Sequence, residues 1–356
     1  MRAALDARGT TEPVQFELET KARAFALRVS PAADSGGARC YALHDVVVND
    51  AEVWISEPTI SDYGDYCTGC AQRVSVGSGY GFFVLPSAAE APEPVYSVRA
   101  RVGLRDCATL TPATAGSPDM LQVELASWQP PAAEARLRLP LAVVVATQHG
   151  LARDAELLPA ALRAVKEIWK AAKIDVELEP HAVISPPAAA IEFSAVDRAA
   201  LVQLEQRARQ ALGPHARDPR WPLVILGTCL RRKDVILGGQ SEPWAYTAHL
   251  PGGSAVGDAP DAIFVAAERC EGLEPGPRFN DAAQLGAVLA HELGHYLGLY
   301  HVVEVDGRQD ALSDTSADDA NLMRASPLAS STSLSAGQIS IARRHNAFAR
   351  SPDSQP

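Results

Sequence analysis

His-Glu-Leu-Gly-His-Tyr-Leu-Gly-Leu-Tyr-His occupies residues 291–301 of this 356-residue chain. The apolar residues before it recur at helical spacing from Asp281 onward, so His291 and His295 are predicted to stand one turn apart on one helix face. Two imidazoles placed in this way can each bring a nitrogen to about 2.0–2.1 Å from one zinc ion. Glu292 lies beside them, where its carboxylate can take a proton from a zinc-bound water instead of ligating the metal.

The third histidine, His301, can share this ion only if the helix ends before it. A straight helix would carry His301 about 15 Å along the axis from His291, at about 1.5 Å per residue. Gly298 lies where the break is needed, because glycine readily adopts the positive φ that reverses the chain. Three histidine ligands leave a fourth position for water, which is the arrangement of a catalytic zinc site. The alternative interpretation is a helix that carries these histidines on its surface by chance.

The stretch resembles the long zinc-binding motif HExxHxxGxxH of the metzincin metalloproteases. Members of that group also have a methionine-containing turn beneath the metal, and Met323 follows His301 at a suitable distance to form this apolar floor. Within the group the chain looks most like the pappalysin-type subfamily. The resembling features are Gly298-Leu299-Tyr300-His301, Asp314-Thr315, Asn321-Leu322-Met323 and Leu334-Ser335-Ala336-Gly337-Gln338.

The resemblance covers about residues 139–350 and implies a zinc-dependent endopeptidase that acts on protein or peptide substrates. In such an enzyme a zinc-bound water would attack the scissile carbonyl, with Glu292 as the general base. The alternative, from another functional class, is a surface binding or adhesion protein whose protease-like domain is vestigial. The presence of Glu292 argues against it, because a decayed site has no need of its general base.

A segment upstream is similar to the strand above the cleft in that family, and residues 244–250 could form an edge strand on which an extended peptide lies. An interior strand is the alternative. The candidate substrate-binding residues are Ala245, Tyr246, Thr247 and Ala248. His249, which follows them, is expected to be a surface or strand residue.

Residues 1–135 have the pattern of β-structure, with apolar and polar residues alternating at 98–102 and 121–125. Further strands are predicted at 25–29, 46–55 and 73–85, and a glycine-rich cluster at 77–81 should split the last of these into a hairpin. Many short strands separated by turn residues predict an N-terminal all-β sandwich, which would be an accessory domain of unknown role.

From residue 139 the pattern changes to a strand, a helix and a strand, which is typical of a βαβ unit. The fold class is therefore predicted to be α+β and multidomain, with a metzincin-like catalytic domain at 139–352. That domain should contain a twisted mixed sheet, a backing helix and the active-site helix. The elements predicted after the sandwich are strands at 136–145, 174–178, 222–226, 244–250 and 262–266, and helices at 154–173, 195–212 and from 281.

The amino-acid composition excludes several classes of protein and of binding partner. A hydrophobic fraction of 47% with 21% charged residues excludes collagen-like, coiled-coil and wholly disordered chains. The net charge of −11 is spread over both halves, so no basic half is present to hold nucleic acid or an anionic membrane. The longest apolar runs are of strand length, well short of the roughly 18 residues of a membrane-spanning helix.

Six cysteines divide into four before residue 139 and two after it, and this even split suits disulfides and an oxidising compartment. We therefore expect a secreted protein, or one outside the cell envelope, although Met1–Asp6 is too polar for a signal peptide. A cytosolic zinc hydrolase with free thiols is the alternative. Cys229 and Cys270 are expected to pair in the second domain.

The four remaining cysteines are Cys40, Cys67, Cys70 and Cys107. Cys67 and Cys70 are each expected to bridge to one of the other two. Three alternatives remain: a redox pair, half of a zinc knuckle, and a cysteine (Cys40 or Cys107) that caps the zinc and keeps the enzyme latent.

An acidic loop follows the motif, and its carboxylates could bind calcium, as in some relatives, or could simply be solvated. The residues concerned are Asp306, Asp310, Asp314, Asp318 and Asp319. Asp318 or Asp319 could also form a pocket for a basic substrate residue after the scissile bond.

Overall fold

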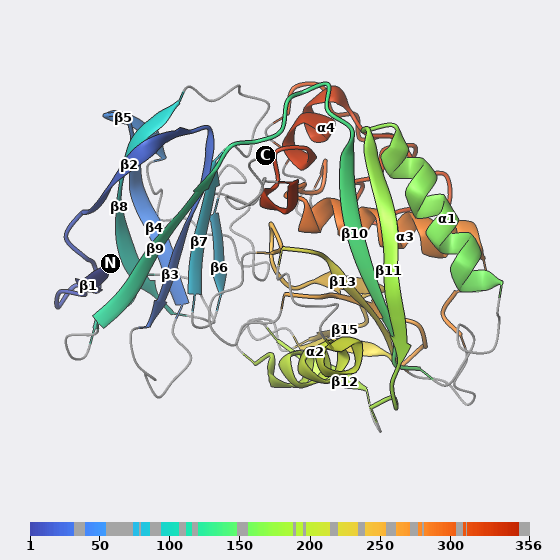
Figure 1. Cartoon of the computed structure of the whole chain (residues 1–356). Helices are drawn as coiled ribbons and strands as arrows, with labels where there is room; N and C mark the ends of the chain where they lie inside the picture. Colours follow the sequence, from blue (N-terminus) through green and yellow to red (C-terminus); the bar gives the residue numbers. More distant parts are fainter. Residues whose placement is uncertain are drawn as a thin grey trace. The chain divides into compact units, whose positions relative to one another are not determined.

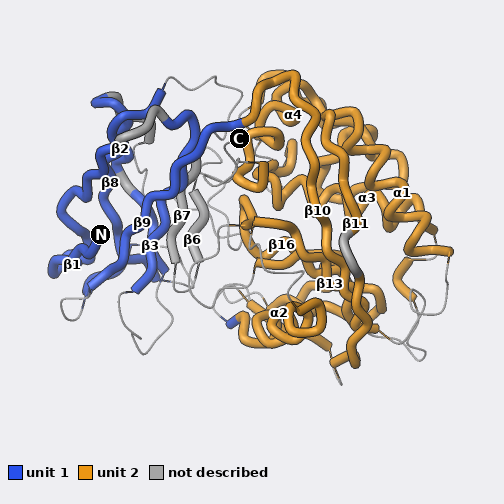
Figure 2. The backbone as a smooth tube through the Cα atoms, in the orientation of Figure 1, with its two compact units in different colours: residues 1–130, 195–197, 235–237 blue, residues 131–194, 198–234, 238–356 orange. Residues whose placement is uncertain are grey.

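The chain forms two compact units in a computed structural model (Figure 2). Unit 1 consists of Met1–Pro130 with the short segments 195–197 and 235–237, and unit 2 holds the rest. The described residues are 1–31, 40–54, 74–77, 80–85, 94–106, 112–115, 120–147, 156–187, 190–194, 197–213, 220–233, 239–253, 261–270, 277–279, 281–303, 309–310 and 312–348.

Unit 1 contains two antiparallel sheets (Figure 1). Their strand orders are β1-β9-β3-β7-β6 and β2-β8-β4-β5. The strands are β1 (Arg2–Ala4), β2 (Val14–Ala22), β3 (Ala24–Pro31), β4 (Cys40–Val48), β5 (Ala51–Trp54), β6 (Val74–Gly77), β7 (Tyr80–Leu85), β8 (Val95–Arg105) and β9 (Met120–Trp128). One apolar core takes residues from both sheets, among them Leu27 of β3, Leu43 of β4 and Val102 of β8.

Two predictions for this unit can be compared with the structure directly. The run 73–85 is a hairpin of β6 and β7, as the glycine cluster indicates. The single strand predicted at 46–55 is wrong, because β4 ends at Val48 and β5 begins at Ala51. Asn49 and Asp50 between them both have positive φ, the conformation of a two-residue hairpin turn that asparagine and aspartate tolerate.

The main sheet of unit 2 has the order β11-β10-β13-β17-β16. Its first four strands are parallel, and β16 at the end of the order is antiparallel to β17. The strands are β10 (Leu137–Val145), β11 (Ile174–Val183), β13 (Leu223–Gly227), β16 (Ala245–Thr247) and β17 (Ile263–Ala266). The predicted βαβ unit is confirmed, since β10 and β11 pair in parallel on either side of α1 (Leu157–Lys170) in the chain.

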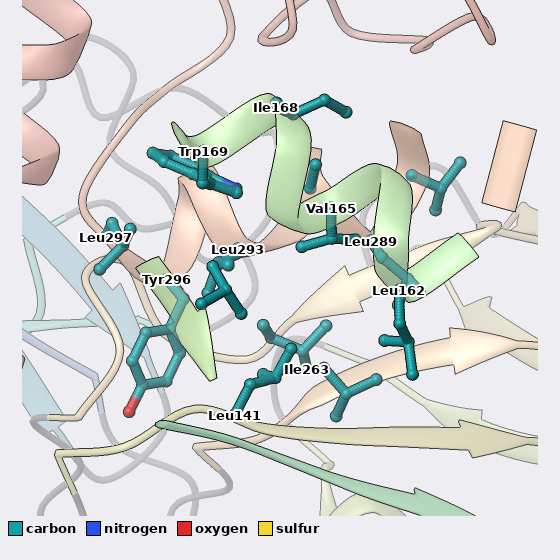
Figure 3. Packing of buried hydrophobic residues seen from close by; sticks show 14 of the residues in the cluster. Leu141, Leu162, Val165, Ile168, Trp169, Ile263, Leu289, Leu293, Tyr296 and Leu297 are labelled. Atoms are coloured by element: carbon teal, nitrogen blue, oxygen red, sulfur yellow. The ribbon is translucent and has the colours of Figure 1, made fainter. Parts of the chain in front are cut away.

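Helices cover both faces of this sheet, because alternate strand residues point to opposite sides. In β17, Ile263 and Val265 join the core beneath α1 and α3 (Ala282–Tyr296), whereas Phe264 joins the core beneath α2 (Ala199–Leu212). Figure 3 shows side chains of α1, such as Trp169, packed with those of α3 and the sheet. The helical part of the 291–301 motif therefore belongs to a helix that packs in a continuous apolar core.

Smaller elements complete unit 2. A three-stranded sheet has the order β12-β14-β15, and a disulfide joins Cys229 to Cys270, with Cα atoms 4.8 Å apart. These elements are β12 (Ile191–Phe193), β14 (Leu230–Lys233), β15 (Gln240–Ser241), α4 (Ala336–Ala342) and the 3-10 helix η3 (Asn346–Phe348). Cys40 of unit 1 is also disulfide-bonded, and no cysteine is free in the described part of the chain. Cys67, Cys70 and Cys107 lie outside the described residues.

Within the described segments, no helix is both long enough and apolar enough to cross a membrane.

The buried His345, near the end of unit 2, is expected to make the free energy of unfolding depend on pH. In His345 the Nε2–H donates to the Gly252 carbonyl at 2.9 Å, and Nδ1 accepts the Ala347 N–H at 3.1 Å. Burial lowers the pKa of His345 from its usual 6.5 to about 4. The unfolded chain therefore takes up a proton first as pH falls, so stability is lost between about pH 6.5 and pH 4.

The lowered pKa of His345 corresponds to a total loss of roughly 3 kcal/mol in the free energy of unfolding across this pH window. We expect His345→Gln to flatten the fall in unfolding free energy over this window by that order of magnitude. Urea unfolding at stepped pH values, for both proteins, measures the difference. Parallel curves for the two proteins would contradict the prediction.

Candidate metal centre

The helix that carries the motif, α3, begins at a defined cap. Asp281 is extended and its carboxylate accepts the Ala283 N–H at 2.9 Å, which satisfies one of the donors that a helix start leaves unpaired. From Leu285 to Tyr296 every residue of the helix is buried. The two motif histidines of α3, His291 and His295, lie four residues apart, and their ring centroids are 4.6 Å apart.

The helix ends at Tyr296, and Gly298 has a φ of +96°. The Gly298 N–H donates to the His295 carbonyl at 2.9 Å, and the Leu299 N–H donates to the Gly294 carbonyl at 2.9 Å. This pair of bonds is the glycine-containing helix stop known as the Schellman motif. The reversal brings His301 back to the two helical histidines, so the break expected at Gly298 is present in the structure.

One ring nitrogen from each of the three histidines lies within 4.8 Å of the others. The Nε2 atoms of His295 and His301 are 3.1 Å apart. Nitrogen ligands at about 2.0–2.1 Å from a tetrahedral zinc ion lie about 3.3 Å from one another. The His295–His301 spacing is thus already close to that of two ligands of one metal ion. His301 is partly exposed, whereas the other two are buried, so the centre is reached from the side of His301.

Backbone carbonyls fix the orientation of the two buried rings. Nδ1 of His291 lies 2.7 Å from the Leu322 carbonyl, and Nδ1 of His295 lies 2.7 Å from the Leu299 carbonyl. A carbonyl oxygen only accepts, so each Nδ1 carries the hydrogen and each Nε2 keeps its lone pair for a ligand.

Burial also favours the neutral form in which imidazole binds a metal. It lowers the pKa of His291 to about 3 and holds the pKa of His295 well below its usual value. Both rings therefore stay deprotonated at Nε2 at neutral pH. Orientation, protonation and spacing all fit one zinc ion.

Met323, which is predicted to form the floor of this centre, packs against Gly294 of α3. Its side chain is fully buried, and its sulfur lies 2.5 Å from the position that a Cβ on Gly294 would occupy. Any side chain at position 294 would therefore displace the sulfur. The Asn321 side chain accepts the Met323 N–H at 2.8 Å, and the Met323 carbonyl accepts the Val302 N–H at 2.9 Å. The Met323 turn is thus closed by Asn321 and is bonded to Val302, directly after the motif.

Glu292 is 7% exposed and its carboxylate accepts a hydrogen bond from the Thr247 hydroxyl at 2.7 Å. Burial raises the pKa of Glu292 to about 7, while the hydrogen bond from Thr247 and the neighbouring His301 act in the opposite direction. A carboxylate with such a pKa can exchange protons near neutral pH, as a general base must.

The segment 244–250 is shorter as a strand than the sequence predicts, since β16 is Ala245–Thr247 and Ala248 lies just beyond it. β16 has a partner, β17, on one side only among the described strands. Trp244, immediately before it, is 46% exposed. The expectation of a surface or strand position for His249 is wrong, because this residue follows the strand and is buried, with Nδ1 3.8 Å from the Asp261 carboxylate.

The acidic loop uses its carboxylates in protein contacts. Asp310 accepts from the Thr315 hydroxyl at 2.6 Å, and Asp314 accepts from the Gly337 N–H at 2.8 Å. Asp318 accepts the Ala320 N–H at 2.9 Å, and Asp319 lies 2.9 Å from Arg324. Asp306 is outside the described residues, and calcium binding stays a prediction.

Three contributions to the centre were not anticipated from sequence. They are the side chain of Thr247 on Glu292, the close approach of Met323 to Gly294, and the carbonyls that hold the two histidine rings. Of these three, only the approach of Met323 to Gly294 has a cue in the sequence, since a glycine inside a helix often marks close packing.

No protein-family profile matches the sequence, and no curated protein matches it. Several solved structures resemble part of it. An archaemetzincin from Methanopyrus kandleri is 15% identical over 60% of this chain and 90% of its own, with a TM-score of 0.31.

Metalloproteinase-II from Bacteroides fragilis is 16% identical over 62% of this chain and 55% of its own, with a TM-score of 0.34. A chaperone–substrate complex is 10% identical over 68% of this chain and 39% of its own, also with a TM-score of 0.34. Similarity this low assigns neither family nor function, so the function is argued from the site itself.

Proposed function

We propose that the chain is a zinc-dependent endopeptidase that hydrolyses peptide bonds in protein substrates. The observation that carries the proposal is the geometry of the three histidines. One ring nitrogen of each lies within 4.8 Å of the others, carbonyls orient the two buried rings, and the buried Glu292 directly follows His291 in the helix. An open three-histidine centre with an adjacent base is the arrangement of hydrolytic zinc enzymes.

The metal ligands in this proposal are His291, His295 and His301. When bound, zinc supplies Lewis-acid polarisation of the scissile carbonyl and lowers the pKa of a water to about 7. Glu292 accepts the proton of the attacking water on its carboxylate and later gives it to the leaving amine. The burial of Glu292 keeps bulk water from competing for that proton.

An extended substrate would lie along β16, the strand at the end of the sheet order. An extended peptide can bind at the end of a sheet by adding its main chain as one more strand. This placement would hold the scissile bond beside Glu292, because Thr247 of β16 contacts that residue directly.

The proposal extends to the family and the setting of the enzyme. We propose a metzincin-like catalytic domain of the pappalysin type, on the strength of the 291–301 motif and the Met323 turn. The first unit would be a β-sandwich accessory domain, since its two antiparallel sheets share one core. The Cys229–Cys270 disulfide supports a location outside the cytosol.

A cleavage assay with a casein-type substrate tests the function. Activity should be abolished by a chelator and restored by one equivalent of zinc. Full activity in the chelated protein, with zinc absent by elemental analysis, would contradict a zinc mechanism. A protein that binds one zinc and cleaves no member of a broad peptide library would favour the alternative, a non-catalytic binding or adhesion protein.

A further inference from the structure

We infer that Thr247 is a positioning residue that holds the carboxylate of Glu292 in its working orientation. The inference rests on the proposed function, since it assigns a second residue to the same site. In the sequence Thr247 stood out only as part of a strand that could bind substrate. In the structure its side chain contacts the Glu292 carboxylate.

The Thr247 hydroxyl contacts two oxygens of Glu292. It lies 2.7 Å from Oε2 and 3.0 Å from the backbone carbonyl oxygen. A hydroxyl has one proton to donate, and its shorter contact is the one to the carboxylate. This hydrogen bond restricts rotation of the Glu292 carboxylate.

Burial makes this contact difficult to replace. Thr247 is 1% exposed and Glu292 is 7% exposed, so bulk water has little access to the pair. A buried carboxylate that loses its donor keeps the cost of desolvation without the compensating bond.

The position in the strand explains why this side chain faces α3. Side chains alternate along a strand, and Tyr246 and Ala248 both belong to the core on the α2 side of the sheet. Thr247, between them, points to the opposite side, where α3 lies. The strand that would bind the peptide thus also orients the base, so substrate and base share one rigid support.

Three variants separate positioning from a structural role. Thr247→Val keeps the shape and removes the hydroxyl, whereas Thr247→Ser keeps the hydroxyl and removes a methyl group. Thr147→Val is the matched control, because Thr147 is also buried and its hydroxyl also donates to a buried glutamate, Glu268, in the same unit.

For the zinc-loaded full chain, we expect Thr247→Val to lower kcat for a peptide substrate roughly 10- to 100-fold. KM should change by less than about threefold, because ground-state binding of the substrate is retained. The zinc content should stay close to that of the wild type. Thr247→Ser should recover most of kcat, and Thr147→Val should leave it unchanged. An unchanged kcat in Thr247→Val, or a loss that Thr247→Ser fails to rescue, would overturn the inference.

A second readout does not depend on catalysis. Thr247→Val should lower the melting temperature by on the order of 2–4 °C in the wild-type background. The shift should be clearly smaller when Glu292 is already alanine, because the carboxylate is then absent and only the backbone carbonyl of residue 292 remains as an acceptor. Equal shifts of the melting temperature in the wild-type and Glu292→Ala proteins would overturn the inference, because the Thr247 hydroxyl would then not act through the Glu292 carboxylate. If the wild-type protein cleaves nothing but the shifts still differ, the proposed function fails while the Thr247–Glu292 coupling stands.

Discussion

Replacing Glu292 with alanine is expected to lower kcat for peptide cleavage by roughly 100- to 10,000-fold, the range that a lost general base produces. Zinc should still bind at one equivalent, because backbone carbonyls orient His291 and His295, and Nε2 of His295 lies 3.1 Å from Nε2 of His301. Stopped assays of a fluorogenic peptide, with elemental analysis of the same sample, give both quantities.

Two further variants make this result specific. Glu292→Gln keeps the size of the side chain and its contact with Thr247 but cannot accept the proton of the water, so it should be nearly as inactive as Glu292→Ala. Glu167→Ala removes an exposed helical glutamate of the same unit, and should leave kcat unchanged. Activity of Glu292→Gln within about tenfold of the wild type would exclude Glu292 as the base.

The metal centre was predictable from sequence because its geometry is local. His291 and His295 are one helical turn apart, and the return of His301 follows from a glycine stop at Gly298. Each step uses residues less than about three turns apart, where helix geometry alone fixes the distances. Backbone periodicity and one residue type that tolerates positive φ are sufficient for this part of the site.

The remaining contacts could not be read in the same way, because they join distant segments. Glu292 meets Thr247 across 45 positions of sequence, and His291 meets the Leu322 carbonyl across 31. Which residue faces which depends on the sheet order and on how α3 packs, and neither follows from local pattern. The β4–β5 turn is different, since Asn49 and Asp50 are adjacent residues of the types that tolerate the positive φ of a hairpin turn.

The stability of unit 2 is expected to depend on Arg343, a buried cation that directly follows α4. Its guanidinium donates to five backbone carbonyls. The acceptors are Ala172 at 2.7 Å, Lys173 at 3.4 Å, Ala132 at 3.4 Å, Ala133 at 3.0 Å and Ala135 at 2.5 Å. These carbonyls belong to the chain just after α1 and to the segment that leads into β10.

A planar fork of five N–H groups suits this task, because it can serve two separate segments at once. A positive charge at the C-terminal end of α1 is also favourable, since the helix dipole is negative there. Burial lowers the pKa of Arg343, while the nearby Glu134 acts in the opposite direction. The arginine thus joins α4, α1 and β10 around the core that also holds the active-site helix.

Arg343→Ala should therefore lower the free energy of unfolding by roughly 2–4 kcal/mol, because five carbonyls, one of them on the buried Ala172, lose their donor together. Arg343→Lys should recover only part of this, since an ammonium group cannot form the planar fork. The exposed Arg163 of α1 provides the control, and Arg163→Ala should stay within about 0.5 kcal/mol of the wild type. Urea unfolding followed by helical circular dichroism reports on this unit, because the described α-helices all belong to it. If Arg343→Ala unfolds at the same urea concentration as Arg163→Ala, the contacts of Arg343 do not stabilise the core.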